Sequence, residues 1–137
     1  MNDTLRSAYT NTTFCAQTPL GEIRLRIGVA NSLLAQLLSQ FAADEWAFIT
    51  AYNPVSQALS EDENTQRQTE LKERLQQAGL PIFWGEGKGD DSEWPPEPSF
   101  LVLDVNRKKA IAIGRDFGQN AIVAGGADTI PFLFECE

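Results

Sequence analysis

The sequence predicts a single-domain α+β (or α/β) protein, with a mixed β-sheet of about five to seven strands and about three packed helices. Three observations predict this class. The chain has 137 residues, an ordinary length for one domain. Its apolar fraction of 42% argues against disorder. Strand-like and helix-like segments alternate along it, in the order β-β-α-β-α-β-β-α-β-β.

The N-terminal part of the chain predicts a β-hairpin. Residues 5–18 contain Tyr9, Thr12, Thr13, Phe14 and Cys15, residue types that favour strands. After a turn at 19–21, residues 22–29 alternate strictly, with isoleucine and leucine on one side and arginine on the other. This alternation predicts a half-buried second strand.

Two helices and a central strand follow. Leucines spaced by three and four residues up to Phe41 predict a helix, with Asn31 or Ser32 as its N-cap. Residues 46–52 are apolar nearly throughout, which predicts a central strand covered on both faces. A capping box at Ser60 and Glu63 begins the next helix, and Gly79 ends it.

The C-terminal part contains shorter elements. We expect strands at 80–84 and 100–105, separated by a loop at 85–98 that is rich in glycine, proline and acid. Residues 106–118 fit either a helix capped by Asn106 or part of a hairpin, and we favour the helix. Closing strands are expected at 120–124 and 129–134. The residues expected in the core are Leu37, Phe41, Trp46, Phe48, Leu71, Leu75, Phe100, Val102, Phe117 and Ile122.

Composition excludes several classes of function. The chain has no histidine, so it has no Ser-His-Asp triad, Cys-His dyad or His-ligated zinc site. Its formal charge of −8 argues against nucleic acid or an anionic membrane as a partner. No dinucleotide or Walker fingerprint, signal peptide or membrane-length apolar run is present, so we expect a cytoplasmic protein without cofactor or metal. Cys15 and Cys136 are expected to be free thiols.

The acidic residues are concentrated between residues 43 and 97. We interpret this region as a solvated surface that keeps the protein soluble. The alternative is a divalent-cation site that uses carboxylates of the 85–98 loop, although their spacing matches no calcium-binding loop. The carboxylates concerned are Glu86, Asp90, Asp91 and Glu97.

The helix after Ser60 has an unusual face. Leu71, Leu75 and Ala78 form an apolar stripe, and extending it backwards brings in Asn64, Arg67 and Gln68, all within about 60° of Leu71. An amphipathic helix normally keeps that face apolar. The polar part therefore either lines a ligand cleft or satisfies buried polar groups, with Arg67 paired to a carboxylate and Asn64 bonded to a loop.

Two further segments are expected to lie near this polar stripe. Residues 52–54 end the central strand, and crevices at strand ends bind ligands in open α/β sheets. Residues 114–120 contain an arginine, two amides and two glycines, and arginine can hold a carboxylate or phosphate with two hydrogen bonds. The candidate ligand-binding residues are Asn53, Asn64, Arg67, Arg115, Gln119 and Asn120. The candidate general acids or bases are Glu86 and Glu97.

Five blocks of the sequence resemble a small bacterial family known as domain of unknown function 3293. They read W-A-F-I-T-A-Y-N-P at 46–54, S-E-D-E-N-T-Q-R-Q at 60–68, G-E-G at 85–87, W-P-P-E-P-S-F-L-V-L at 94–103 and G-R-D-F-G-Q-N-A-I-V at 114–123. The resemblance implies a compact bacterial protein. It implies no activity and transfers no catalytic residue.

Two hypotheses about function follow. In the first, the protein binds a small polar molecule or anion, a nucleotide being one example, and whether it is an enzyme stays open. In the second, it is a non-enzymatic interaction or regulatory module whose acidic loop contacts a basic partner. A cleft that joins Arg67 to Arg115 would favour the first hypothesis. A filled interior in which both arginines form ion pairs would favour the second.

Overall fold

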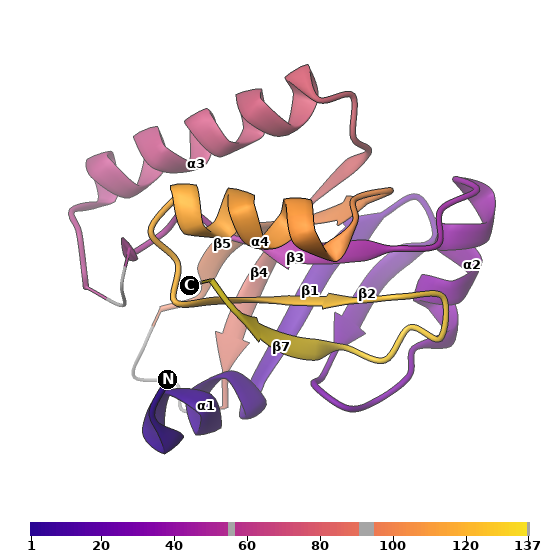
Figure 1. Ribbon diagram of the computed structural model, residues 1–137, viewed down its shortest axis with the longest axis horizontal. Coiled ribbons are helices and arrows are strands. Elements are labelled where there is room, and N and C mark those ends of the chain that lie inside the picture. Colours follow the sequence, from indigo (N-terminus) through magenta and orange to yellow (C-terminus); the bar gives the residue numbers. More distant parts are fainter. Residues whose placement is uncertain (55–56, 91–94, 137) are drawn as a thin grey trace.

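The computed structural model describes residues 1–54, 57–90 and 95–136, and it confirms the α+β class (Figure 1). Seven strands form one sheet in the order β2-β1-β4-β5-β3-β6-β7. The helices are α1 (Asp3–Thr10), α2 (Ser32–Gln40), α3 (Glu61–Gln77) and α4 (Arg107–Asp116). The strands are β1 (Thr12–Thr18), β2 (Gly21–Leu25), β3 (Trp46–Ile49), β4 (Ile82–Gly89), β5 (Glu97–Leu103), β6 (Ala121–Gly125) and β7 (Phe132–Glu135).

The sheet is antiparallel throughout the described residues, where a mixed sheet was predicted. The reason lies in the connections. A parallel pair arises when a helix links two strands that become neighbours. Here α2 links β2 to β3, α3 links β3 to β4, and α4 links β5 to β6, and none of these pairs is adjacent in the sheet.

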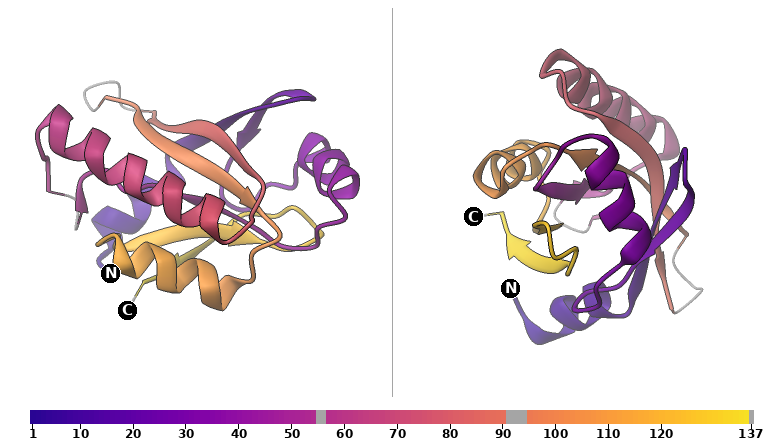
Figure 2. Two further views of the ribbon diagram at one scale, coloured as in Figure 1. Left: turned by 90° about the horizontal axis from the view of Figure 1, so that it is seen from above. Right: turned by 90° about the vertical axis from the view of Figure 1, so that its right-hand side faces the viewer.

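The sheet is strongly curled, and the helices are divided between its two faces (Figure 2). On the outer face, α3 packs on β5 and α4 packs on β6 and β3. The inner face carries α2, whose leucines join the core formed by β1, β2, β3 and β5. The curl brings the segments beside the two edge strands together. The amide of Gly28 donates to the carbonyl of Pro131 at 2.9 Å.

The first predicted strand is wrong in its N-terminal half. Residues 3–10 form α1, capped by Asn2, whose side chain accepts from the amide of Leu5 at 2.8 Å. No residue of α1 is fully buried, and its apolar face is small, formed by Leu5, Ala8 and Tyr9, so the strand-favouring residues that follow determined the prediction. The predicted hairpin itself is confirmed: β1 and β2 pair from Thr18 and Gly21 onwards, and Ile23 and Leu25 are buried.

The capping predictions are confirmed. Asn31 caps α2, Asn106 caps α4, and Ser60 forms a capping box with Glu63 at the start of α3. The preferred helical interpretation of 106–118 is therefore correct. The predicted central strand is also confirmed, although it ends at Ile49: β3 lies between β5 and β6 and all four of its residues are buried.

The glycine-rich segment 85–89 is not a loop but the second half of β4. Composition alone predicts a turn here, whereas in the structure the glycines allow close packing. A Cβ atom on Gly85 would lie 2.3 Å from the carbonyl oxygen of Cys15 and 3.0 Å from the ring of Phe48. Only glycine therefore allows β4 to approach so closely at this position.

The predicted core is largely confirmed, with two corrections. Phe41 is 40% exposed, because it is the C-cap of α2 and packs edge-on against the ring of Phe83 at the surface. Phe117 is half-buried. Cys15 and Cys136 are free and buried. Within the described residues, no helix has the length and apolar character needed to cross a bilayer.

Candidate functional site

The polar stripe of α3 binds the backbone of residues 51–53, which leave the sheet after β3. The amide of Ala51 donates to Gln68 Oε1 at 3.1 Å, and the amide of Asn53 donates to Asn64 Oδ1 at 2.8 Å. From the other side, Gln119 Nε2 donates to the carbonyl of Tyr52 at 3.0 Å. These side chains satisfy the buried backbone groups that the sheet no longer pairs.

Arg67 completes this arrangement. Its Nε donates to the carbonyl of Ala51 at 2.9 Å, and one of its Nη atoms donates to the carbonyl of Phe117. Phe117 is the C-cap of α4, where the helix dipole favours a positive charge. Arg67 therefore joins three elements: α3, the end of β3 and the C-terminus of α4. We call the side chains of Asn64, Arg67, Gln68 and Gln119 the latch.

Two backbone conformations shape the latch. Asn53 has a φ of +46°, a left-handed conformation that asparagine tolerates better than most residues. Its side-chain oxygen accepts from the amide of Leu59 at 3.1 Å and from Asn64 Nδ2 at 2.8 Å. Gly118 has a φ of +73°, and a Cβ there would lie 2.8 Å from Pro54. Glycine is therefore required at 118 for the α4–β6 turn to reach the latch.

A cavity of about 560 Å³ lies beside the latch, between α1 and the inner face of the sheet. Successive strand residues face opposite sides, so β4 presents Gly87 and Gly89 to this cavity, and β5 presents Glu97 and Ser99. Several strand residues at this end of the sheet are small: Gly87 and Gly89 on β4, Ser99 on β5 and Ala121 on β6. At the other end, larger side chains such as Trp46, Leu101 and Leu103 fill the interior together with α2.

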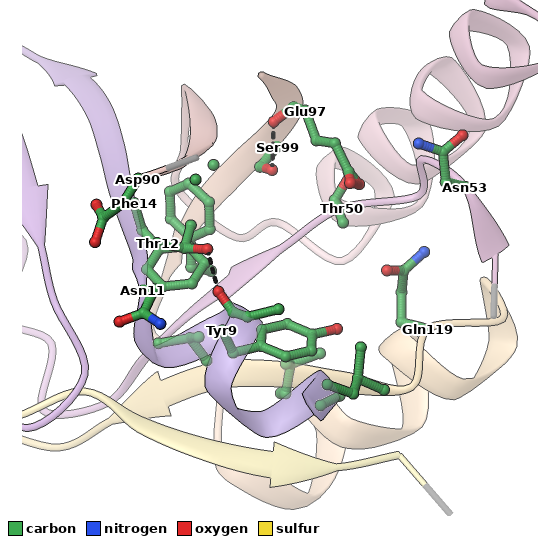
Figure 3. Close-up of a pocket in the computed structure, with 18 of the residues that line it drawn as sticks. Tyr9, Asn11, Thr12, Phe14, Thr50, Asn53, Asp90, Glu97, Ser99 and Gln119 are labelled. Carbon is green, nitrogen blue, oxygen red and sulfur yellow. Dashed lines mark hydrogen bonds between the residues drawn. The ribbon is translucent and has the colours of Figure 1, made fainter. Parts of the chain in front are cut away.

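Polar groups border both ends of the cavity, and Asn11, Thr12 and Asp90 lie on the same side as Phe14 (Figure 3). The Glu97 carboxylate, the amides of Asn53 and Gln119, and the Tyr9 hydroxyl gather at one end. Phe14 lies at the other end, with its ring 5.3 Å from that of Phe48 and at a steep angle to it.

Most hydroxyl groups in the wall are bonded to the protein itself. Thr12 Oγ1 donates to the carbonyl of Ala8 at 2.6 Å, Thr50 Oγ1 to that of Pro98 at 2.7 Å, and Ser99 Oγ to that of Glu97 at 3.0 Å. These bonds hold α1 to β1 and β3 to β5. Because each of these hydroxyl protons already has an acceptor, the wall offers a bound molecule few hydroxyl donors.

Tyr9 differs from these hydroxyl groups because it lies within reach of the charge of Glu97. Its pKa is raised to about 12, first by burial and then by the negative charge of Glu97, while a backbone hydrogen bond with Ala121 acts in the opposite direction. The phenol is therefore neutral at every physiological pH. The influence of Glu97 on Tyr9 also means that the electric field of this carboxylate reaches into the cavity.

The comparisons with known proteins identify a family. Residues 49–122, more than half of the chain, match the family described as Protein of unknown function (DUF3293). The chain belongs to the DUF3293 family. The comparison with curated proteins and the comparison with solved structures each found no match. The matched stretch includes the whole latch and the Thr50, Asn53, Glu97 and Ser99 part of the cavity wall.

The structure of this DUF3293 chain brings together only some of the predicted site residues. The structure brings four of them together at the latch: Asn53, Asn64, Arg67 and Gln119. Two of these, Asn64 and Arg67, belong to the polar stripe of α3. Asn53, Gln119 and Glu97 also border the cavity. Arg115 is exposed on α4, Asn120 lies at the start of β6 with its carbonyl bonded to the amide of Cys136, and neither lines the cavity.

Of the acidic residues predicted as candidates, Asp90 and Glu97 border the cavity and Glu86 does not. Glu86 faces away from the cavity, because Gly87 beside it on β4 faces inwards. Asp90 lies at the rim, where Arg26 holds it with two hydrogen bonds of 2.8 and 3.1 Å. Asp91 lies outside the described residues. Within the described part of the chain, no group of three or more candidate ligands could hold a metal ion.

Several cavity residues of this DUF3293 chain were not predicted. Tyr9 lies on helix α1, which was not predicted. Thr12, Thr50 and Ser99 belong to no catalytic or ligand-binding motif. One signal was available in the sequence. Strand alternation places Glu97 and Ser99 on the same face of β5, so a strand that begins at 97 rather than 100 would have marked both.

Proposed function

We propose that the protein binds a small organic molecule in the cavity under α1. The observation that carries this proposal is the cavity itself, about 560 Å³ in volume, with aromatic rings in its wall and a group of polar side chains, Asn53, Glu97 and Gln119, at one end. Small-molecule sites are typically concave and mostly apolar, with a few polar groups that orient the ligand. The size lies within the usual range of about 300–1,000 Å³ for such sites.

The sequence analysis predicts a small polar molecule or an anion, a nucleotide being one example, but the geometry does not support an anion. No lysine or arginine is among the described residues that line the cavity. Arg67 uses its guanidinium on the backbone carbonyls of the latch. An anion in this cavity would face the Glu97 carboxylate, and the described lining residues offer it no cationic side chain, which is electrostatically unfavourable. We therefore propose an uncharged or cationic ligand.

A fluorescence titration tests this proposal. The probe is N-phenyl-1-naphthylamine, an uncharged molecule whose emission rises in apolar surroundings. We expect saturable binding to the wild type and at least five-fold weaker binding to Ala8→Trp, because Ala8 of α1 lines the cavity and an indole there would occupy it.

The matched control is Ala35→Trp. Ala35 is also an exposed helical alanine, but it lies on α2 and away from the cavity. This variant should bind the probe like the wild type. Equal weakening by both substitutions, or no saturable binding to the wild type, would contradict the proposal.

A further inference from the structure

We propose that the ligand is an organic amine, bound with its ammonium group at the Glu97 end of the cavity and its apolar body against Phe14 and Phe48. This inference rests on the proposed function and specifies its ligand class. It follows from the charges and hydrogen-bonding groups that the cavity wall presents.

The charged groups of the wall are all acidic. Among the described lining residues, the charged side chains are Asp90 and Glu97. Asp90 is held at the rim by Arg26, outside the polar end. Glu97 is half-buried, and its carboxylate is directed into the cavity. A carboxylate has about four lone-pair sites, so it can accept from a ligand in addition to its protein contacts.

The latch determines which atom of Gln119 faces the ligand. Gln119 Nε2 donates to the carbonyl of Tyr52, so the amide oxygen is the atom turned towards the cavity (Figure 3). Gln119 is buried, and its orientation is therefore set by the protein rather than by solvent. Together with Glu97, it provides two acceptors on the same side. An ammonium group has three donors and no acceptor, which suits this pair.

Tyr9 and Asn53 complete the polar end. The neutral Tyr9 hydroxyl can accept from an ammonium through its oxygen lone pairs. The side-chain oxygen of Asn53 is already used by Leu59 and Asn64, so its amide nitrogen is the group that faces the cavity. That nitrogen can donate to the Glu97 carboxylate or to an acceptor beside the amine. It does not neutralise the carboxylate, because an amide carries no net charge.

The apolar end suits the body of the same molecule. Phe14 and Phe48 are buried and present aromatic surface at the side opposite the carboxylate. A molecule that extends across the cavity would therefore place carbon against these rings and nitrogen beside Glu97. The short side chains of Gly87, Ser99 and Ala121 leave the space between the two ends open.

A set of three probes with nearly the same skeleton tests the ligand class. The probes are 2-phenylethylamine, 2-phenylethanol and 3-phenylpropionate, titrated at pH 7 by calorimetry and by backbone amide NMR shifts. We expect the amine to bind at least ten-fold more tightly than the alcohol, with shifts at residues 8–14, 97–99 and 119–123. The propionate should bind most weakly.

Two variants show whether Glu97 is responsible. In Glu97→Gln the preference for the amine over the alcohol should fall to near unity, while affinity for the alcohol changes little. Glu86→Gln is the matched control, because it removes the same charge from the adjacent strand on the opposite face of the sheet. It should keep the preference. Amide spectra report whether each variant is folded, and the wild-type comparison of amine with alcohol tests the inference without any variant.

The outcomes separate the two proposals. If the alcohol binds the cavity as well as the amine does, the ligand class is wrong and the proposed function stands. The same conclusion applies if N-phenyl-1-naphthylamine binds and none of the three probes does. If the propionate binds as well as the amine does, the ligand class is wrong and so is the proposal of an uncharged or cationic ligand, and only the cavity as a binding site stands. If neither the naphthylamine nor any phenyl probe shifts the cavity residues, both proposals fail.

Discussion

Arg67 is predicted to be a structural residue whose loss destabilises the ligand-free protein. Arg67→Ala removes the two hydrogen bonds from its guanidinium to the carbonyls of Ala51 and Phe117. Hydrogen bonds that involve a charged group contribute about 1.5–3 kcal/mol each. Because Arg67 is only half-buried and water can reach part of the site, we reduce this contribution to about 1–2 kcal/mol for each bond. The expected loss in unfolding free energy is about 2–4 kcal/mol.

Arg74→Ala is the matched control for this prediction. Arg74 lies on the same helix, two turns further on, and forms an ion pair with Asp116 at 2.6 Å. Both side chains of this pair are about half exposed, at 42% and 51%. Such surface pairs contribute about 0–1 kcal/mol. The two substitutions change the residue type in the same way, so the difference between them isolates the latch.

Thermal and urea denaturation measure the difference. At roughly 4 °C per kcal/mol for a chain of this length, Arg67→Ala should lower Tm by about 8–16 °C. Arg74→Ala should lower it by less than about 4 °C. Equal shifts would refute the latch interpretation. Arg67 would instead be a ligand-binding residue if Arg67→Ala left the Tm of the ligand-free protein unchanged and abolished the rise in Tm that a bound molecule causes.

Three further predictions concern the interior. Leu71 is fully buried, so Leu71→Ala should lower the unfolding free energy by about 2–5 kcal/mol, and an unchanged urea midpoint would show that the α3 packing is wrong. Because the pKa of Tyr9 is raised to about 12 from 10, the folded protein keeps a proton between pH 10 and 12 that the unfolded chain has lost. Unfolding free energy should therefore fall more steeply with pH over this window in the wild type than in Tyr9→Phe, and parallel curves would contradict the Tyr9 environment. Burial raises the pKa of both cysteine thiols, that of Cys136 to about 11, so neither Cys15 nor Cys136 should react with iodoacetamide at pH 8 until the protein is unfolded. Rapid labelling of the native protein would overturn this last expectation.

The latch was accessible to sequence reasoning because helical geometry is regular. Once Leu71 and Leu75 fixed the register of α3, simple rotation placed Asn64 and Arg67 on the same face. Whether this face bound a ligand or the backbone could not be decided from the sequence. The answer depends on where residues 51–53 leave the sheet, which is a property of strand pairing far away in the chain.

The cavity was not accessible in the same way. It exists because small residues of separate strands, Gly87, Ser99 and Ala121 among them, coincide on one part of the inner face. In a single sequence, glycine predicts a turn, and for this reason the second half of β4 was predicted to be a loop. The coincidence becomes visible only when the strand order and the register are known. The helix that covers it, α1, has no fully buried residue, and its apolar face consists of Leu5, Ala8 and Tyr9, a pattern too short to outweigh the strand-favouring residues beside it.

The contact between the two ends of the curled sheet has a consequence for how the chain folds. The amide of Asn31 donates to Thr129 Oγ1 at 2.8 Å across 98 positions of sequence, next to the bond between Gly28 and Pro131. Bringing such distant residues together costs loop-closure entropy, which must be lost before the contact can stabilise the fold. Proteins dominated by distant contacts fold slowly, in milliseconds to seconds. On a ribosome, the two ends of the sheet would therefore come together only after residues 129–131 have been synthesised, and until then the core formed by β1, β2 and α2 would lack its contacts with β6 and β7.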